Sequence, residues 1–359
     1  MTTTAPGASM ESYQLTGYGA PLERLEAARP VPSGDEVLLA VEACGGCHSD
    51  LHLADGYFDL GDARRLDLTG GRELPFTLGH EISGVVVACG AGAAGVAIGE
   101  RRVVYPWIGC GACPTCDAGE EHLCAAPRAL GITRAGGFAD HVLVPHARYL
   151  FDPGPIAAPP AATCACSGLT AYGALRKVAA REAPTPHLLL VGLGGVGMAA
   201  LALAPSVVTA DLIAADVDAA KLDAAVGRGA AGTVDAAAAD AVKQVRRLTG
   251  GGVSAAIDFV GSPQSAAFAL GALAPRGTLV VVGLFGGAFK LSVPLLPLKQ
   301  LTIRGSYVGS LAEMAELMTL VRGGAVAPLP IDQRPLAEAQ GALDDLRAGA
   351  VLGRVVLRP

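Results

Sequence analysis

A glycine-rich run between a strand and a helix places the strongest constraint on how this chain can fold. The apolar run 188–191 leads directly into the sequence GLGGVG at 192–197, and a helical pattern follows. This order predicts a β-strand, a tight turn and a helix whose N-terminus faces a pyrophosphate. Gly192 permits the turn, Gly194 lets the backbone approach the phosphates, and Gly197 lets the helix pack closely on the strand. The residues expected at the phosphates are Gly192, Gly194, Gly195, Val196 and Gly197.

Strand and helix patterns alternate through this half of the chain. Runs of strand type lie at 188–192, 212–216, 255–259 and 278–283, with helical patterns between them. Alternation of this kind predicts a doubly wound parallel sheet, the Rossmann architecture, in an α/β chain. Asp216 ends the second strand, where a carboxylate accepts from ribose hydroxyls and repels a 2′-phosphate, so NAD is favoured over NADP. The alternative is a glycine turn beside an acidic surface residue.

The residues before the alternating region have a different pattern. Short apolar runs at 37–41, 82–88, 102–105 and 138–144 are separated by Gly, Pro and Asp. They predict a β-rich, barrel-like domain without a helix of normal length. After residue 308 we expect one amphipathic helix near 311–318 and a strand at 353–357 that returns to complete this domain. The sequence thus predicts a discontinuous catalytic domain, 1–167 with 308–359, and a cofactor domain, 168–307.

Charge and hydropathy narrow the range of partners. The net charge is −6 and the basic residues are scattered, which argues against a nucleic-acid surface and against an anionic membrane surface. The apolar runs are far shorter than the roughly 20 residues that cross a bilayer. The N-terminal residues lack the basic start and apolar core of a signal peptide. We therefore expect no nucleic-acid or membrane partner and a cytoplasmic protein.

Four of the nine cysteines form one local cluster. Cys110, Cys113, Cys116 and Cys124 supply four thiolates to a tetrahedral ion and leave no ligand position open, as in structural zinc sites. An iron–sulfur cluster and reduced, unliganded thiols are the alternatives. His122 stands beside the fourth cysteine and is expected to be an ordinary loop histidine.

A second metal site is predicted from residues that lie farther apart. A catalytic zinc needs three protein ligands and one open position, and Cys₂His is one of the known sets. Cys47 and His80 offer two ligands. Cys166, at the expected junction of the two domains, is placed to be the third.

With these motifs the chain resembles zinc-dependent alcohol dehydrogenases of the medium-chain dehydrogenase/reductase superfamily. The resemblance implies a GroES-like catalytic domain, a second zinc ion, NAD, and an alcohol, aldehyde or ketone substrate. It implies Cys47, His80 and Cys166 as ligands, with Glu81 close behind and sometimes replacing water on the metal, and Asp50 orienting a ligand histidine. A homodimer or homotetramer is expected. The matching motifs are Cys47-His-Ser-Asp, Gly79-His80-Glu81, the four cysteines, Cys166-Ser-Gly-Leu-Thr and Gly192-Leu-Gly-Gly-Val-Gly.

The same motifs distinguish neighbouring cysteines. The match selects Cys166 rather than Cys164, and the following His-Ser-Asp selects Cys47 rather than Cys44. Cys44, Cys89 and Cys164 are expected to be small buried residues.

The resemblance also implies a proton path from the substrate. Ser49 is the expected first acceptor, and the path continues through the nicotinamide ribose to His52, for which a surface histidine is the alternative. His48 is expected near the pyrophosphate. Lys221 is expected at the adenosine ribose or else as a solvated helix lysine. Further residues expected beside the nicotinamide are Thr170, Val260, Val282 and Leu284.

The sequence leaves several interpretations open. The polar insertion Asp59–Arg72 is expected either to line the substrate entrance or to form an oligomer contact. Polyol dehydrogenases commonly carry Glu as the third ligand and often lack the four-cysteine cluster, so simple alcohols are favoured. The same motifs would also suit a non-catalytic NAD- or zinc-binding protein, or a quinone-reductase-like enzyme without catalytic zinc.

Overall fold

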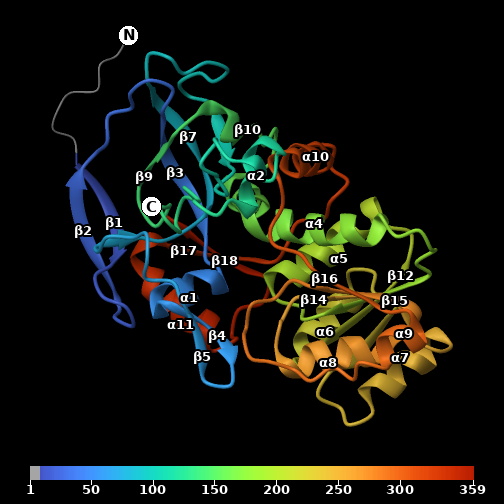
Figure 1. Cartoon of the computed structure of the whole chain (residues 1–359). Helices are drawn as coiled ribbons and strands as arrows, with labels where there is room; N and C mark the ends of the chain where they lie inside the picture. The colour runs from blue at the N-terminus through green and yellow to red at the C-terminus, as the bar shows by residue number, and fades with distance from the viewer. Residues whose placement is uncertain (1–8) are drawn as a thin grey trace.

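A seven-stranded sheet forms the centre of the first domain in the computed structural model, which describes residues 9–359. Its strand order is β10-β8-β7-β3-β18-β17, with β9 also pairing with β3, and β18 comes from the far end of the chain. A smaller sheet, β2-β1-β6, packs beside it (Figure 1). The strands are β1 Ser9–Leu15, β2 Leu22–Ala28, β3 Val37–Gly45, β6 Phe76–Thr77, β7 Glu81–Cys89, β8 Arg101–Val104, β9 His141–Val144, β10 Leu150–Phe151, β17 Ile331–Pro335 and β18 Arg354–Arg358.

A six-stranded parallel sheet forms the second domain. Its order, β13-β12-β11-β14-β15-β16, is that of a doubly wound dinucleotide-binding fold, so the predicted α/β architecture is confirmed. The edge strands β13 and β16 and the helix α7 were not predicted, because none of them carries a long apolar run. The strands are β11 His187–Val191, β12 Asp211–Asp216, β13 Gly232–Asp235, β14 Val253–Asp258, β15 Leu273–Val281 and β16 Thr302–Gly305. The helices are α4 Leu169–Ala179, α5 Gly195–Val207, α6 Ala219–Val226, α7 Ala241–Thr249, α8 Pro263–Ala272 and α9 Leu295–Lys299.

Two further helices were not predicted. The first domain contains the eight-residue α1, His48–Asp55, where no helix of normal length was expected. This helix lacks an apolar stripe and begins instead at a local hydrogen bond, from the backbone N–H of Cys47 to Asp50 Oδ2 at 2.8 Å. The C-terminal segment contains α11, Ala339–Arg347, in addition to the expected α10, Leu311–Arg322.

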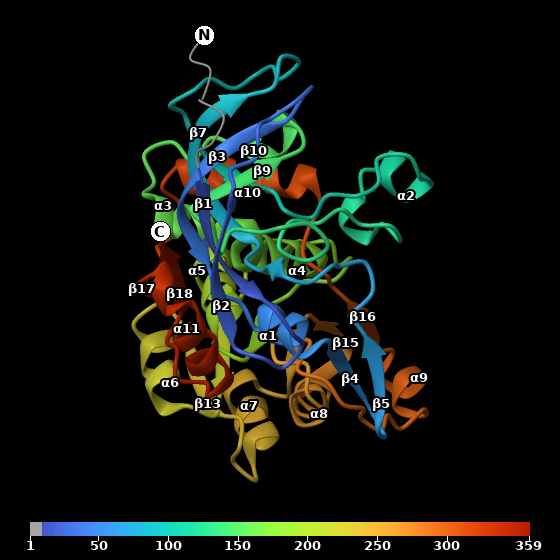
Figure 2. The ribbon, with the colours of Figure 1, turned by 90° about the vertical axis from the view of Figure 1, so that its left-hand side faces the viewer.

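A short hairpin connects α1 to the cofactor domain. Strands β4, Tyr57–Gly61, and β5, Arg64–Asp67, form a separate two-stranded sheet. The hairpin lies beside the loop that follows β15 in both views (Figures 1 and 2). The carbonyl of Asp59 accepts a hydrogen bond from the N–H of Gly287 at 3.1 Å, so the backbones of the two domains meet here.

The hydrophobic core continues from one domain into the other. One cluster of buried side chains runs from β3 and β7 through α4 and α5 to β11. Within the first domain, next to its boundaries with the second, two buried hydrogen bonds run from Tyr105 Oη to the carbonyl of Gly309 at 2.9 Å and from Trp107 Nε1 to the carbonyl of Ala165 at 2.9 Å. No helix within residues 9–359 is both long and apolar enough to cross a membrane. The domain boundaries themselves stay predictions.

Candidate active site

The three residues predicted to bind catalytic zinc come together at the domain junction. One donor atom from each of Cys47, His80 and Cys166 lies within 4.8 Å of the other two. Cys47 stands at the N-terminus of α1 and His80 precedes β7. Cys166 lies in a single π-helical turn, Cys164–Gly168, between α3, Ala158–Thr163, and α4. All three are buried, with at most 6% of their surface exposed.

The chemistry of this group fits a zinc ion. Neither ring nitrogen of His80 has a hydrogen-bond partner of acceptable geometry in the described part of the chain, although the residue is fully buried. Such an orphaned nitrogen beside two sulfurs is accounted for by a metal that accepts its lone pair. The contact with Cys166 lowers the pKa of Cys47, and the same contact raises the pKa of Cys166. A cation among the three would stabilise both thiolates.

Asp50 supports two of these ligands. Its Oδ1 lies 3.3 Å from Nδ1 of His80, and its Oδ2 accepts the N–H of Cys47. Burial lowers the pKa of His80, but the nearby Asp50 carboxylate outweighs burial and raises it to about 10. The position of Asp50 is that of a carboxylate behind a zinc-bound histidine.

Glu81 is directed toward an arginine from the far end of the chain. Both of its carboxylate oxygens accept from Arg354, Oε2 from Nε at 2.8 Å and Oε1 from Nη2 at 2.6 Å. Oε1 also accepts the N–H of Ser167 at 2.8 Å. Both side chains are buried, and Glu81 is not among the mutually close metal donors in residues 9–359. That Glu81 sometimes replaces water on the catalytic zinc stays a prediction.

One cavity of about 320 Å³ contains every residue predicted to bind the cofactor. It extends from the zinc ligands Cys47 and Cys166 to the glycine turn. The sequence therefore identified residues that are far apart in the chain but share one cavity. The predicted residues that line it are Ser49, His52, His48, Thr170, Gly192, Gly194, Gly195, Val196, Gly197, Asp216, Lys221, Val260, Val282 and Leu284.

The glycine turn has the geometry that its sequence predicts. Gly192 adopts a φ of +88°, which favours glycine, and a Cβ at Gly197 would overlap the carbonyl oxygen of Gly192. A Cβ at Gly194 would meet no protein atom within 4 Å. Asp216 Oδ2 accepts the N–H of Leu193 at 2.6 Å, so the carboxylate holds the turn as well as lining the cavity.

The predicted proton path lies on one helix beside the metal donors. Ser49 and His52 both belong to α1 and line the cavity. The His52 ring is tilted against Phe58 of the hairpin, with 4.7 Å between ring centroids. Burial, with a smaller effect from His48, lowers the pKa of His52 below its usual 6.5. His52 is therefore neutral at pH 7 and is able to take up a proton.

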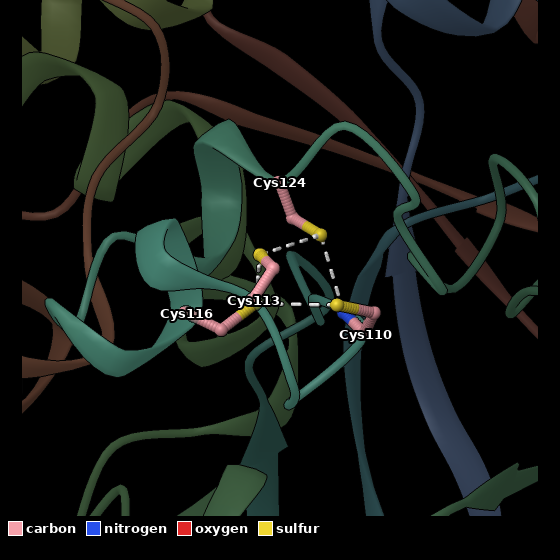
Figure 3. Close-up of side chains that lie close together, drawn as sticks. All are labelled: Cys110, Cys113, Cys116 and Cys124. Atoms are coloured by element: carbon pink, nitrogen blue, oxygen red, sulfur yellow. Dashed lines mark hydrogen bonds between the residues drawn. The ribbon is translucent and has the colours of Figure 1, made fainter.

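The four remaining predicted ligands form a separate lobe around α2, Pro114–Asp117 (Figure 3). Cys113 Sγ lies 3.5 Å from Cys116 Sγ and 3.8 Å from Cys124 Sγ, and Cys110 Sγ lies 3.9 Å from Cys116 Sγ. Backbone N–H groups of Cys110 and Ala126 donate to Cys124 Sγ and lower its pKa to about 7. This closed set of four sulfurs fits a structural zinc ion.

The remaining cysteines and His122 mostly follow the prediction. Cys44 and Cys164 are buried, but Cys89 is only partly buried because it is the last residue of β7. His122 lies in a short 3₁₀ helix, Glu121–Leu123, where its Nε2 is 3.3 Å from Glu120 Oε2, outside the four-sulfur group.

Two polar residues of the site were not predicted. Arg354 lines the cavity, and a Cβ on Gly195 would lie 3.0 Å from its guanidinium, so its positive charge stands at the phosphate turn. A charged residue within the apolar strand 354–357 was the available signal. Tyr307 packs edge-on against Trp107 at 5.7 Å, and Trp107 lies 5.3 Å from His80. No sequence pattern distinguished Tyr307.

Comparison with known proteins agrees with this geometry. The profile of the alcohol dehydrogenase GroES-like domain matches residues 33–153, and that of zinc-binding dehydrogenases matches residues 195–323. NAD-dependent alcohol dehydrogenases of Sulfurisphaera tokodaii and Saccharolobus solfataricus are each 39% identical over 98% of this chain and 100% of their own. The crystal structure of the alcohol dehydrogenase from Aeropyrum pernix has a TM-score of 0.88 at 33% identity, covering 97% of this chain and 100% of that one. The chain therefore belongs to the zinc-containing medium-chain alcohol dehydrogenase family.

Proposed function

We propose that this protein is an NAD-dependent alcohol dehydrogenase that transfers a hydride between an alcohol and the nicotinamide. The observation that carries the proposal is the single cavity that is lined both by the glycine turn and by Cys47 and Cys166, whose sulfurs form one donor group with His80. A bound zinc ion would supply a Lewis acid that lowers the pKa of an alcohol. The residues on the Gly192 side of the cavity would bind the dinucleotide.

Side chains beside the metal donors would carry the proton of the alcohol away from the substrate. Ser49 lies on the same helix as His52, and both line the cavity that would hold the nicotinamide ribose. Ser49 would accept the proton of the alcohol and His52 would receive it at the outer end of the path. Asp50 would keep His80 in place while the charge at the site changes.

The pocket walls favour simple alcohols at the reacting end. Trp107 and Leu284 line the cavity and are apolar, and the third donor is Cys166 rather than a carboxylate. The hairpin 57–67 contacts the loop that carries Leu284, which favours the entrance over an oligomer contact as the role of the Asp59–Arg72 insertion. A polyol dehydrogenase is the alternative. We also propose that the protein is cytoplasmic and forms a homodimer or homotetramer.

Metal content and initial rates test this function together. We expect two zinc ions per chain and reduction of NAD on addition of primary or secondary alcohols, followed by the absorbance of the reduced cofactor. Zinc at the four-cysteine lobe alone would instead support a quinone-reductase-like enzyme. Two zinc ions with no reduction of NAD by any primary, secondary, cyclic or aromatic alcohol would support a non-catalytic protein.

A further inference from the structure

A second, polar cavity adjoins the proposed active site. It has a volume of about 720 Å³ and shares Val282, Gly283, Leu284 and Tyr307 with the catalytic cavity. The polar residues that line this polar cavity are Glu120, His122, Arg176, Lys177, Arg304, Ser306, Tyr307, Ser310 and Glu313.

Two buried polar atoms in its lining lack partners. Ser306 is 6% exposed and its Oγ has no hydrogen-bond partner in the described residues. The His122 side chain is 5% exposed, and its Nδ1 also lacks a partner within residues 9–359. A buried polar atom without a partner costs about 1–3 kcal/mol, so such atoms mark places where another molecule completes the hydrogen bonds.

The polarity of these atoms indicates what kind of group binds. The Nε2 of His122 lies 3.3 Å from Glu120 Oε2, and its Nδ1, which has no partner in the described residues, can take part in a hydrogen bond with a ligand. The hydroxyl of Ser306 either donates or accepts. A ligand hydroxyl suits either atom, because it both donates and accepts a hydrogen bond.

The charges around the polar cavity do not favour an ion. Lys177 and Arg304 line it, but so do the carboxylates of Glu120 and Glu313. Arg176 is already paired with Glu316. Cations and carboxylates thus offset one another, and a neutral hydroxyl group fits this lining better than an anion or a cation.

Tyr307 links the polar cavity to the metal donors. It lines both cavities, and 41% of its surface is exposed. Its ring contacts Trp107, which in turn lies against His80. A substrate whose reacting oxygen lies beside the metal donors would have to pass Tyr307 to reach Ser306.

We propose that the polar cavity binds a second hydroxyl group of the substrate, so that the protein prefers alcohols with a hydroxyl at the far end of an extended carbon chain. This inference rests on the proposed function and specifies its substrate class. Ser306 and His122 are specificity residues in it and take no part in the hydride transfer.

A series of straight-chain α,ω-diols from butanediol to decanediol, each compared with the monohydric alcohol of equal length, tests the proposal. The measured quantity is kcat/KM of the diol divided by kcat/KM of the matching alcohol, using the zinc-loaded protein with NAD. A symmetric diol has twice as many reactive hydroxyls, so binding of the far hydroxyl must raise the ratio above two. We expect an additional factor of roughly 2- to 10-fold at the chain length that reaches Ser306.

Two variants connect this ratio to the polar cavity. Ser306→Ala removes only the unpartnered hydroxyl and should bring the ratio back toward two. His122→Phe should do the same, with zinc content measured because Cys124 is close in sequence. Ser206→Ala, at the end of α5 and away from both cavities, is the matched control and should leave the ratio unchanged.

The outcomes separate the inference from the proposed function. Oxidation of short monohydric alcohols with a ratio of two or less at every length would overturn the inference alone. A ratio above two that persists in Ser306→Ala would place the far hydroxyl elsewhere and would also overturn it. Failure to oxidise any alcohol would overturn the proposed function itself.

Discussion

Arg354 links the metal side and the cofactor side of the site through a single side chain. Its guanidinium donates to both oxygens of Glu81 and lies against Gly195 in the phosphate turn. A buried carboxylate left without its cation is destabilising by about 3–5 kcal/mol, so the pair is important for folding. The same guanidinium offers a rigid, permanently charged donor to a pyrophosphate. One residue thus neutralises Glu81 and would also face a bound pyrophosphate.

Removal of one metal ligand should separate catalysis from cofactor binding. In Cys47→Ala we expect the zinc content to fall from two ions to one and turnover to fall to background, because the Lewis acid is lost. NAD binding, measured by calorimetry, should remain largely intact, since the glycine turn is in the other domain. Cys44→Ala, which changes a buried cysteine outside the donor group, is the control. Loss of NAD binding together with turnover would show that Cys47 is structural.

The lowered pKa of His52 predicts how activity depends on pH. A histidine must be neutral to accept a proton, and burial keeps His52 neutral down to a pH below 6.5. Alcohol oxidation should therefore be constant near neutral pH and decline only as the pH falls through this lowered pKa. In His52→Gln we expect a loss on the order of 10²-fold, partly restored by added imidazole. If kcat/KM falls at low pH in the same way in His52→Gln as in the unmodified protein, the group that titrates is not His52.

At the scale of elements, residues at the end of β12 and just after β14, the two neighbouring strands, stabilise the glycine turn between β11 and α5. Asp216 at the end of β12 accepts the N–H of Leu193 inside the turn, and Val260 from the loop after β14 lies against Gly192. The carboxylate of Asp216 also accepts the N–H groups of Val217 and Asp218, which start the approach to α6. The turn therefore depends on residues outside the GLGGVG sequence.

Because Asp216 also stabilises the glycine turn, replacing it should change both the cofactor preference and the activity with NAD. The double substitution Asp216→Gly with Val217→Arg should shift the ratio of NAD to NADP activity toward NADP, because a repelling carboxylate is replaced by a cation. Activity with NAD should also fall, since the hydrogen bond to Leu193 is lost. Kinetics with both cofactors measure the two effects. An unchanged ratio would remove Asp216 from cofactor selection.

Sequence predicted those parts of the site whose chemistry requires particular residues at fixed spacing. The glycine turn and the four-sulfur lobe are of this kind, because other residues would overlap atoms or fail to bind metal. Helix α1 was missed because it starts at the Asp50–Cys47 hydrogen bond and not at an apolar stripe. The Arg354–Glu81 pair was missed because its partners are far apart in the chain and no local pattern connects them.

At the scale of the whole molecule, the two domains meet on both sides of the catalytic cavity. On one side, a continuous hydrophobic core that runs through α4 and α5 joins them. The hairpin joins them at the other side through Asp59 and Gly287. The second contact is made by a small, exposed sheet, so it is the weaker of the two and is the expected point of opening.

Gly61 offers a test of this contact. A Cβ there would lie 2.6 Å from the backbone nitrogen of Ala288, so Gly61→Val should push the hairpin away from the loop that lines the cavity. We expect a fall in kcat/KM of about 10-fold, since displacements near 1 Å at a site cost up to about 10²-fold.

A substitution within the same turn is the control for this effect. Ala63→Gly changes the turn at a residue with a φ of +58° and should leave kcat/KM unchanged. Equal losses in both variants would mean that the hairpin acts through its own folding and not through the contact with the cofactor domain.

The closeness of the sulfurs in the α2 lobe has a consequence for handling the protein in air. The sulfurs of Cys113 and Cys116 lie 3.5 Å apart. Once a chelator has taken the zinc, an oxidant that takes two electrons while two protons leave should therefore join them as a disulfide. That bond uses two of the four ligands, so added zinc no longer rebinds until a thiol reductant restores them. Chelation under oxygen should therefore be irreversible, whereas chelation under reductant should be reversible.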